Sequence, residues 1–291
     1  MIESAVVESS DTLSVDSQRS AEALVAFVAT IPEIISRETA FARSLGASLI
    51  VADIPFVAGL IAQQAGIPSI AAGNFTWDWI FEHVPAAAPS LETIRSGYRA
   101  FDFALRFPLS QPNGWEVFQE VRDVPLVTPR SVRPREEIRA ELGITEETGP
   151  IVLIGGRALP DPSAAERLKL TCPEFLFLNN RSHPSFHDLV RAADLVVSKL
   201  GYSIAAECVA EGKRLLYPPR TGFREEELLA TSLTDLVPCV SIPVEHWCSG
   251  DWRPWLDQLR SLKEPAFTVD CEGAKACAQA IVSQFVKSSS Q

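Results

Sequence analysis

The sequence predicts an α/β protein made of two Rossmann-like domains in tandem. Short apolar runs alternate with segments of helical periodicity in both halves of the 291-residue chain. Several apolar runs end directly in a glycine or a polar loop, as the buried strands of parallel sheets do. We place the domain boundary between about 128 and 149, which gives an N-terminal domain over residues 1–140 and a C-terminal domain over residues 141–291.

The first half contains a strand–helix–strand unit. Apolar residues recur at helical spacing over 18–45, and Pro32 is expected to kink or divide that helix. The apolar runs at 48–52 and 67–72 are predicted strands, and the segment 56–65 between them is a predicted helix. That order is typical of a βαβ unit with a right-handed crossover.

The second half repeats this alternation. Apolar runs at 150–154, 175–178, 194–198 and 213–217 are predicted strands, with helical segments between them and a closing amphipathic helix over 273–287. The active sites of such sheets lie beyond the carboxyl ends of the strands. The candidate loops are therefore 53–56, 73–83, 155–160, 198–203 and 218–227.

The composition excludes some classes of function. Lys and Arg together number 26 against 37 Asp and Glu, a net charge of −11, so the protein lacks the basic surface of a general nucleic-acid binder. One local anion site remains compatible with this charge, because a helix N-terminus with one or two cations suffices. No apolar run is long enough to span a membrane.

The N-terminal segment and the cysteines favour a cytoplasmic protein. Residues 1–18 lack the basic flank and apolar stretch of a signal peptide. Six cysteines stand at wide spacings without a CxxC pair, which favours reduced thiols over a zinc site. The four histidines show no metal-binding spacing, and we expect no metal and no cofactor.

The strongest local signal lies between residues 198 and 207. A predicted strand stops at Ser198, Gly201 turns the chain, and a helix is expected to begin near Ser203. Free amides at a helix start bind phosphate, and Glu207 lies one turn further on, where its carboxylate can accept hydrogen bonds from ribose hydroxyls. The alternative is an ordinary strand-to-helix turn with a surface glutamate.

Two further loops of the second half carry weaker signals. Gly155-Gly156-Arg157 follows a strand and is either a phosphate loop or a tight turn. In the loop 219–227, Arg220 can pair with a phosphate, and Glu225 or Glu226 can bind sugar hydroxyls. The alternative for this loop is a solvated segment that caps the following helix.

In the first half, residues 73–79 place aromatic and polar side chains directly after a strand. Such a cluster suits stacking against a sugar or lining a cleft. It can equally be core packing, with Thr76 or Asn74 as the cap of a helix. Asp53 stands at a strand end, where it can orient a substrate hydroxyl or cap the next helix.

Several of these motifs, in this order, resemble one family. The run 193–203 with Glu207, followed by Leu215-Leu216-Tyr217 and Arg220-x-x-Phe223-x-Glu225, resembles the donor-binding half of GT-B glycosyltransferases. The sequence resembles in particular the glycosyltransferase-like domains that precede sugar kinases of the L-arabinokinase type and, more distantly, the N-acetylglucosaminyltransferase of lipid-linked muramyl peptide. The likeness covers roughly residues 20–230, and its first-half motifs are 53–55, 65–69, 73–80 and 123–127.

The resemblance implies a nucleotide-sugar site on the second domain. It also implies metal-independent transfer of a hexosyl or N-acetylhexosaminyl group from a UDP- or GDP-sugar to an unidentified hydroxyl, with helix dipoles replacing a cation. The implied donor-binding residues are Gly155, Gly156, Arg157, Lys199, Gly201, Tyr202, Ser203, Glu207, Arg220, Phe223 and Glu225. Asn74, Phe75, Trp77 and Asp78 would lie on the acceptor side, and Asp53 and Asp78 are the candidate catalytic residues.

One departure from the family pattern concerns the N-terminal domain. Relatives open with a strand and a His-Gly-x-Gly-His loop that supplies a candidate base, and no His-Gly pair occurs in this sequence. We therefore expect an incomplete N-terminal domain that lacks its first βα unit, through truncation, completion by another chain, or loss of catalysis. An exposed sheet edge then predicts association with a second copy or a partner chain.

Two alternatives to a transferase stay open. The first is a catalytically inactive nucleotide-sugar-binding or regulatory protein on the same scaffold, which the absent His-Gly loop favours. The second is a nucleotide-sugar 2-epimerase, which shares the architecture but needs acidic residues and a histidine that the sequence does not identify.

Overall fold

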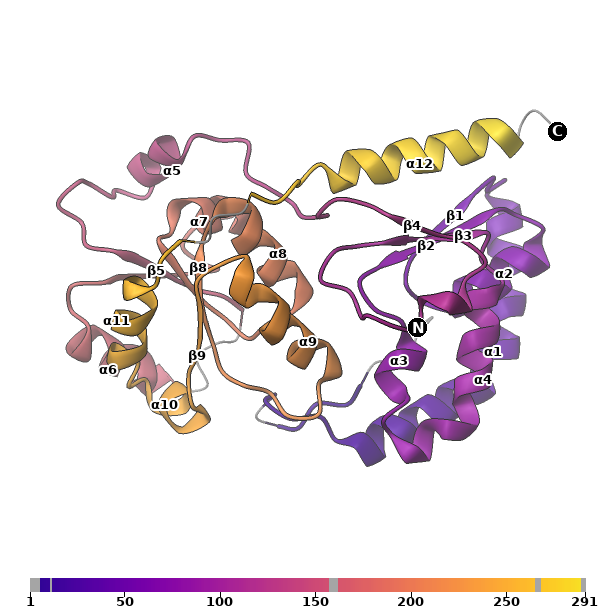
Figure 1. Ribbon diagram of the computed structural model, residues 1–291, viewed down its shortest axis with the longest axis horizontal. Coiled ribbons are helices and arrows are strands. Elements are labelled where there is room, and N and C mark those ends of the chain that lie inside the picture. Colours follow the sequence, from indigo (N-terminus) through magenta and orange to yellow (C-terminus); the bar gives the residue numbers. More distant parts are fainter. Residues whose placement is uncertain (1–5, 11, 157–161, 265–267, 289–291) are drawn as a thin grey trace. The chain divides into compact units, whose positions relative to one another are not determined.

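The computed structural model describes residues 6–10, 12–156, 162–264 and 268–288 (Figure 1). The chain folds into two compact units, each with its own sheet. The first unit comprises Met1–Val127, Gly222–Glu225 and Glu272–Gln291, and the second comprises Thr128–Thr221 and Glu226–Cys271.

The first unit has a parallel sheet of four strands in the order β1-β2-β3-β4. Because all neighbours are parallel, the loops that follow the strands gather at one edge of the sheet. Two of these loops, 54–56 and 74–76, lie within the candidate loops 53–56 and 73–83. The strands are β1 (Ile50–Asp53), β2 (Ser69–Gly73), β3 (Phe103–Arg106) and β4 (Val121–Asp123).

Helices cover both faces of this sheet (Figure 1). The long helix α1 (Ser17–Ser44) continues through Pro32, so the proline does not divide it. It lies with α2 (Val57–Ala65) and α4 (Ala88–Arg99) on one face, and α12 (Gly273–Ser288) covers the other. The short elements are α3 (Trp77–Phe81), η1 (Pro85–Ala87) and η2 (Trp115–Val117).

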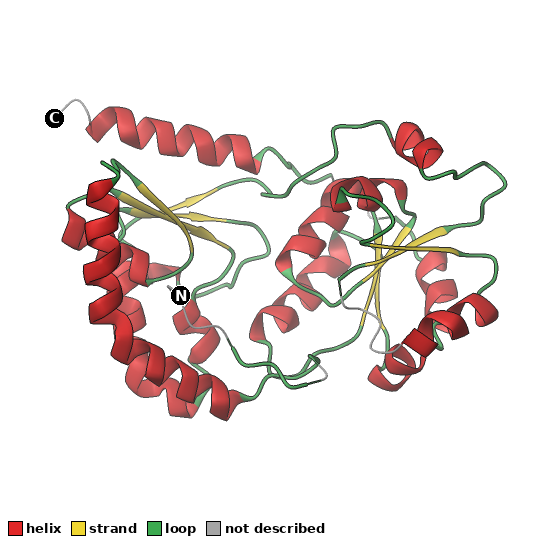
Figure 2. Ribbon diagram, turned by 180° about the vertical axis from the view of Figure 1, so that it is seen from behind, coloured by secondary structure: helices red, strands yellow, loops and turns green. Residues whose placement is uncertain are grey.

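The second unit has a parallel sheet of five strands in the order β6-β5-β7-β8-β9. Helices flank this sheet, with α7 and α8 packing against each other and α11 against β8 and β9 (Figure 2). The strands are β5 (Ile151–Ile154), β6 (Leu176–Asn179), β7 (Leu195–Val197), β8 (Arg214–Tyr217) and β9 (Cys239–Ser241). The helices are α5 (Arg135–Glu141), α6 (Pro162–Thr171), α7 (Phe186–Ala192), α8 (Tyr202–Glu211), α9 (Arg224–Ser232), η3 (Leu233–Asp235), α10 (Val244–Ser249) and α11 (Arg253–Ser261).

The predicted fold class, two tandem Rossmann-like α/β units, is confirmed, while the limits of the units differ from the predicted ones. Residues 128–140 count with the second unit, because Ser131 donates a 2.6 Å hydrogen bond to Asp188 and α5 is anchored by arginine–carboxylate pairs. Helix α12 counts with the first unit, because Ala276, Cys277 and their apolar neighbours pack on its core. Among the described residues, no helix has both the length and the apolar character needed to cross a membrane.

Candidate functional site

The loops after β5 and β7 meet at the carboxyl edge of the second unit's sheet. The Gly155 amide donates to the Val197 carbonyl at 2.8 Å. A Cβ at Gly155 would lie 3.1 Å from Ser198 Oγ and 3.7 Å from the Phe186 ring, so this position favours glycine. Gly156 follows with φ of 61°, a backbone conformation that glycine adopts without strain. Gly155 thus lets the loop after β5 approach both Ser198 after β7 and the Phe186 ring at the start of α7.

The start of α8 is open. Its N-cap residue Gly201 has an extended backbone and no side chain caps the helix. The Ser203 and Ile204 amides have no acceptor among the described residues, as expected for the first turn of a helix. A Cβ at Gly201 would meet no atom of the described residues within 4 Å, so neither strain nor packing among them requires glycine there. An open helix N-terminus beneath a glycine suits an anion that approaches the backbone closely.

Glu207 lies one turn into α8, and its side chain is 6% exposed. Its Oε2 is 3.1 Å from Nδ1 of His187, which is the second residue of α7 and is 42% exposed. No other hydrogen bond to this carboxylate occurs within the described ranges, which leaves Oε1 available to a ligand. Burial raises the pKa of Glu207, and the His187 hydrogen bond opposes that rise.

The predicted cations of this site differ in their surroundings. Arg157 lies outside the described residues. Lys199 is half-buried beside Ser198, whose hydroxyl donates to the Lys199 carbonyl at 3.0 Å. Arg220 is 7% exposed, its amide donates to Glu226 Oε1 at 2.7 Å, and its Nε lies 3.6 Å from Glu226 Oε2. Arg220 is therefore held by a buried carboxylate of its own unit. This contact agrees better with the alternative, a segment that caps the following helix, than with a phosphate-binding arginine.

The segment 222–225 packs with the acceptor-side residues of the first unit. Asn74 donates from Nδ2 to Glu225 Oε1 at 2.8 Å, and both residues are buried. Phe223 shares a cavity of only about 20 Å³ with Phe75 and Trp77, whose rings meet edge to face at 5.1 Å. These aromatic side chains fill one another's space, which agrees with the alternative of core packing.

The two candidate catalytic carboxylates have contrasting environments. Asp78 is 4% exposed and Oδ2 lies 3.1 Å from Nε of Arg95, while its buried Oδ1 has no hydrogen-bond partner in the described structure. Asp53 is exposed at the end of β1, and desolvation raises its pKa. It does not cap α2, which lacks a side-chain cap. Ile54 follows with φ of 67°, a strained conformation for a β-branched residue of the kind found at functional sites.

The structure therefore assembles two separate groups from the predicted site residues. Gly155, Gly156, Gly201, Ser203 and Glu207 gather at the carboxyl edge of the second sheet. Phe223 and Glu225 instead join the acceptor-side residues of the first unit. Sequence analysis interpreted His187 as a structural residue and left it out of the site, although its place at the start of a helix after β6 puts it at the same sheet edge. Within the described ranges, no group of three or more His, Cys, Asp or Glu residues forms a metal site.

Comparisons with known proteins agree with this architecture. No family model matches the chain. An L-arabinokinase of Arabidopsis thaliana is 31% identical over 92% of this chain, and the chain spans only 27% of that protein's length.

Among solved structures, the fold is similar to that of several glycosyltransferases. Spinosyn rhamnosyltransferase SpnG complexed with thymidine diphosphate has a TM-score of 0.57 at 12% identity, covering 83% of this chain and 73% of that one. The kitacinnamycin glycotransferase also has a TM-score of 0.57, at 13% identity over 83% of this chain and 75% of its own. The chain thus has the GT-B glycosyltransferase fold.

Proposed function

We propose that the second unit binds the diphosphate and ribose of a nucleotide sugar at the carboxyl ends of β5 and β7. One observation carries the proposal: the uncapped start of α8 stands beneath open space at Gly201, one turn before the buried carboxylate of Glu207. The amides at the helix start would bind the diphosphate, and the free Oε1 of Glu207 would accept a ribose hydroxyl. The thymidine diphosphate in SpnG supports a nucleoside diphosphate as the ligand class.

We further propose that the protein transfers the sugar to an acceptor hydroxyl without a metal. The helix dipole and amides of α8 would stabilise the charge that develops on the leaving diphosphate. Of the two candidate bases, Asp53 suits the role better, because its carboxylate has a raised pKa and no ion pair within the described structure. The second candidate is a protein that binds a nucleotide sugar without turnover. The ion pair between Asp78 and Arg95 favours this candidate, because it occupies the carboxylate of the other candidate base.

We propose that the first unit's sheet is the surface through which the protein associates with a second copy or a partner chain. β1 is an edge strand, and the nearby side chains of Phe41 and Val51 are 58% and 49% exposed. An exposed edge with apolar side chains is a surface on which another strand can pair.

Calorimetric titration with UDP, GDP and TDP tests nucleotide binding. We expect Glu207→Gln to weaken the binding of the preferred nucleotide about tenfold or more, because a hydrogen bond to a charged group contributes about 1.5–3 kcal/mol. Glu136→Gln on α5 is the matched control, since Glu136 is exposed and has no ion pair in the described structure. Absence of nucleotide binding by the native protein would overturn the proposal, and unchanged affinity in Glu207→Gln would remove Glu207 from the site.

A further inference from the structure

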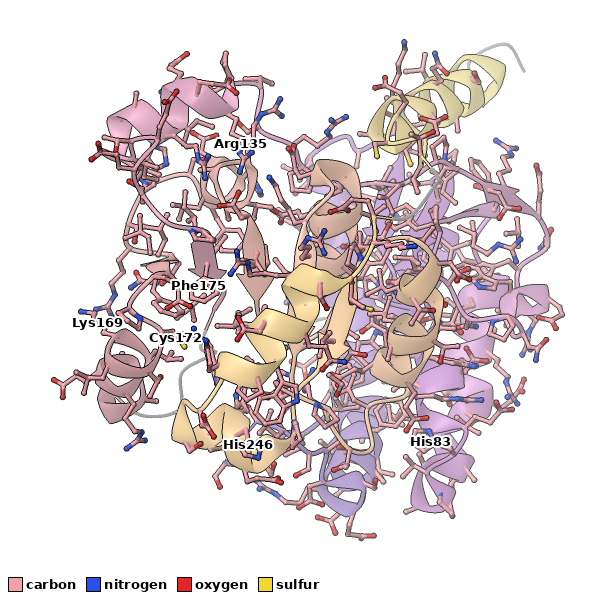
Figure 3. All side chains as sticks on the ribbon, turned by 60° about the vertical axis from the view of Figure 1, so that its left-hand side comes forward. His83, Arg135, Lys169, Cys172, Phe175 and His246 are labelled. Carbon is pink, nitrogen blue, oxygen red and sulfur yellow. The ribbon has the colours of Figure 1, made fainter. Side chains whose placement is uncertain are left out.

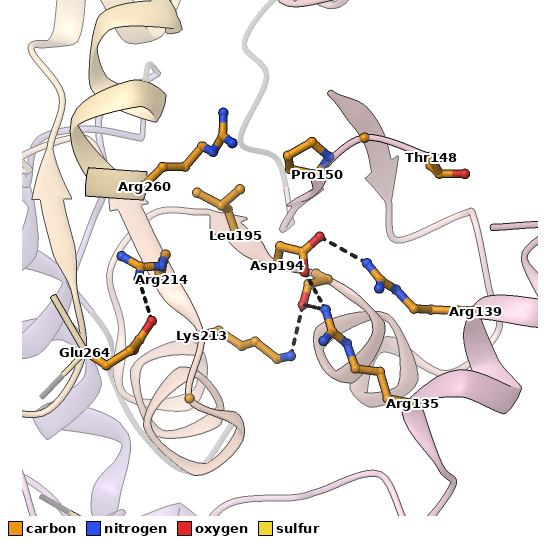
Figure 4. A pocket seen from close by; sticks show the side chains of 13 residues that line it. Arg135, Arg139, Thr148, Pro150, Asp194, Leu195, Lys213, Arg214, Arg260 and Glu264 are labelled. Carbon is orange, nitrogen blue, oxygen red and sulfur yellow. Dashed lines mark hydrogen bonds and ion pairs between the residues drawn. The ribbon is translucent and has the colours of Figure 1, made fainter. Parts of the chain in front are cut away.

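The opposite edge of the second unit's sheet holds a cavity that the proposed nucleotide site does not use. It has a volume of about 550 Å³ and lies at the amino ends of β5, β7 and β8 (Figure 4). Five cationic side chains line it, against the two carboxylates of Asp194 and Glu264. The cations are Arg135, Arg139, Lys213, Arg214 and Arg260.

Such a local excess of positive charge stands out in a protein with a net charge of −11. It concentrates anions, because a recess lined by one sign of charge focuses its field. The volume falls within the range of small-molecule sites, roughly 300–1,000 Å³.

Part of the positive charge is structural. Asp194 binds Arg135 and, at 3.0 Å, Nη2 of Arg139 (Figure 4). It also accepts a hydrogen bond from the Ile151 amide at 2.8 Å, so Asp194 links α5 to the start of β5. Arg214 donates to two backbone carbonyls and lies 2.5 Å from Glu264. Both carboxylates of the cavity, Asp194 and Glu264, are therefore already bonded to arginines.

Several donors remain after those bonds are counted. Nη1 of Arg135 and Nη1 of Arg139 have no acceptor among the described residues. Arg260 has no carboxylate partner in the described part of the chain and lies over the Phe175 ring at 5.5 Å. Guanidinium groups with unused nitrogens are suited to phosphate, which accepts paired hydrogen bonds.

Lys213 adds a buried cation to the same cavity. It is 7% exposed, and its ammonium donates to the carbonyls of Arg191 and Ala193, both at 2.9 Å. Burial, together with the nearby charge of Arg135, lowers the pKa of Lys213 to about 8, against the opposing charges of Glu211 and Asp194. A bound anion would relieve the cost of keeping this ammonium charged.

We propose that this cavity binds a small molecule with two or more adjacent phosphate charges, at a site separate from the proposed nucleotide site. The two sites lie at opposite ends of the same strands, so ligands at one do not occupy the other. The phosphate contacts come from Arg135, Arg139 and Arg260. The buried ammonium of Lys213 adds positive charge to the wall of the cavity.

Calorimetric titration with inorganic pyrophosphate tests the proposal. The full chain is titrated both as the native protein and as Gly201→Val, in which a branched side chain closes the proposed nucleotide site. This variant separates the two sites, because Gly201 does not line the cavity. We expect pyrophosphate to bind, and Arg260→Gln and Arg139→Gln each to weaken it about fivefold or more. Lys169→Gln makes the same change of charge on α6, away from this cavity, and should bind as the native protein does (Figure 3).

Two results would overturn the proposal. One is the absence of pyrophosphate binding, and the other is native affinity in both arginine variants, which would mean that the cations only fasten α5. Circular dichroism and thermal melting establish that the variants are folded, and Arg260, exposed on α11, is the variant least coupled to folding. Tight citrate binding without pyrophosphate binding would refute the phosphate assignment. If UDP fails to bind while pyrophosphate binds with this arginine dependence, the nucleotide proposal fails and the present one stands.

Discussion

The loop after β2 in the first unit and the loop after β7 in the second unit occupy equivalent places, each between a parallel strand and a helix. The amides that enter α3 are already bonded: the Thr76 amide donates to Gln111 at 2.8 Å, and the Trp77 amide donates to Tyr98 at 2.9 Å. The entry to α3 is also buried, with Thr76 0% and Trp77 9% exposed, whereas a Cβ at Gly201, the N-cap of α8, would meet no atom of the described residues within 4 Å. The same strand–loop–helix unit is therefore closed by protein in one place and open to a ligand in the other.

The largest expected effect is at the open loop. Gly201→Val would place a branched side chain in the space where a diphosphate approaches the backbone. We expect nucleotide affinity to fall about 100-fold, because the ligand loses its contact with the amides of α8. Stability should change little, since the added Cβ meets no protein atom within 4 Å and the backbone is extended. Calorimetric titration and thermal melting of the variant measure the two effects separately.

A loss of stability with unchanged affinity would contradict this interpretation of Gly201. It would show that the glycine serves the fold, as Gly97 does in α4, where a Cβ would collide with the backbone of Phe56. The two glycines thus mark the difference between space kept for a ligand and space closed by packing.

The closed loop should respond in the opposite way. Asn74→Ala removes the donor to Glu225 inside the first unit, where both side chains are buried. We expect the free energy of unfolding to fall by about 2 kcal/mol, because a buried carboxylate loses this hydrogen bond. Chemical denaturation measures this change. Asn180→Ala, at an exposed turn, is the matched control, and equal stability of the two variants would show that the Asn74–Glu225 bond contributes little.

The sequence predicted β1, β2, β5, β6, β7 and β8 because each is a short apolar run between polar breaks, whereas β4 and β9, of three residues each, were not predicted. The run 67–72 became β2 and the run 150–154 became β5, within about two residues. Sequence analysis placed α12 in the C-terminal domain, whereas the helix packs on the sheet of the first unit. An amphipathic pattern shows that one face of a helix is buried but not which sheet buries it.

The polar loop 219–227 shows the same limit for the site. Its charged residues fit a donor site by composition, but three-dimensional contacts decide their partners. Arg220 pairs with Glu226 within the second unit, and Glu225 pairs with Asn74 within the first. His187 was left out of the predicted site because its partner Glu207 lies 20 residues away in sequence. Only the pairing of β5 with both β6 and β7 brings the helices that carry the two residues, α7 and α8, together.

The smallest expected effect concerns that histidine and sharpens the account of the open loop. His187→Gln removes the hydrogen bond that opposes the raised pKa of Glu207, so this pKa rises further. Ribose binding by a carboxylate is present above the pKa of the acid and is lost as the pH falls through it. We therefore expect affinity for the nucleotide to change by less than about threefold at pH 7, because Oε1 of Glu207 can still accept the ribose hydroxyl. Weaker binding should set in at a higher pH in the variant than in the native protein, and calorimetric titrations from about pH 5 to 8 measure this shift. Identical pH profiles would show that His187 lies beside Glu207 without tuning it.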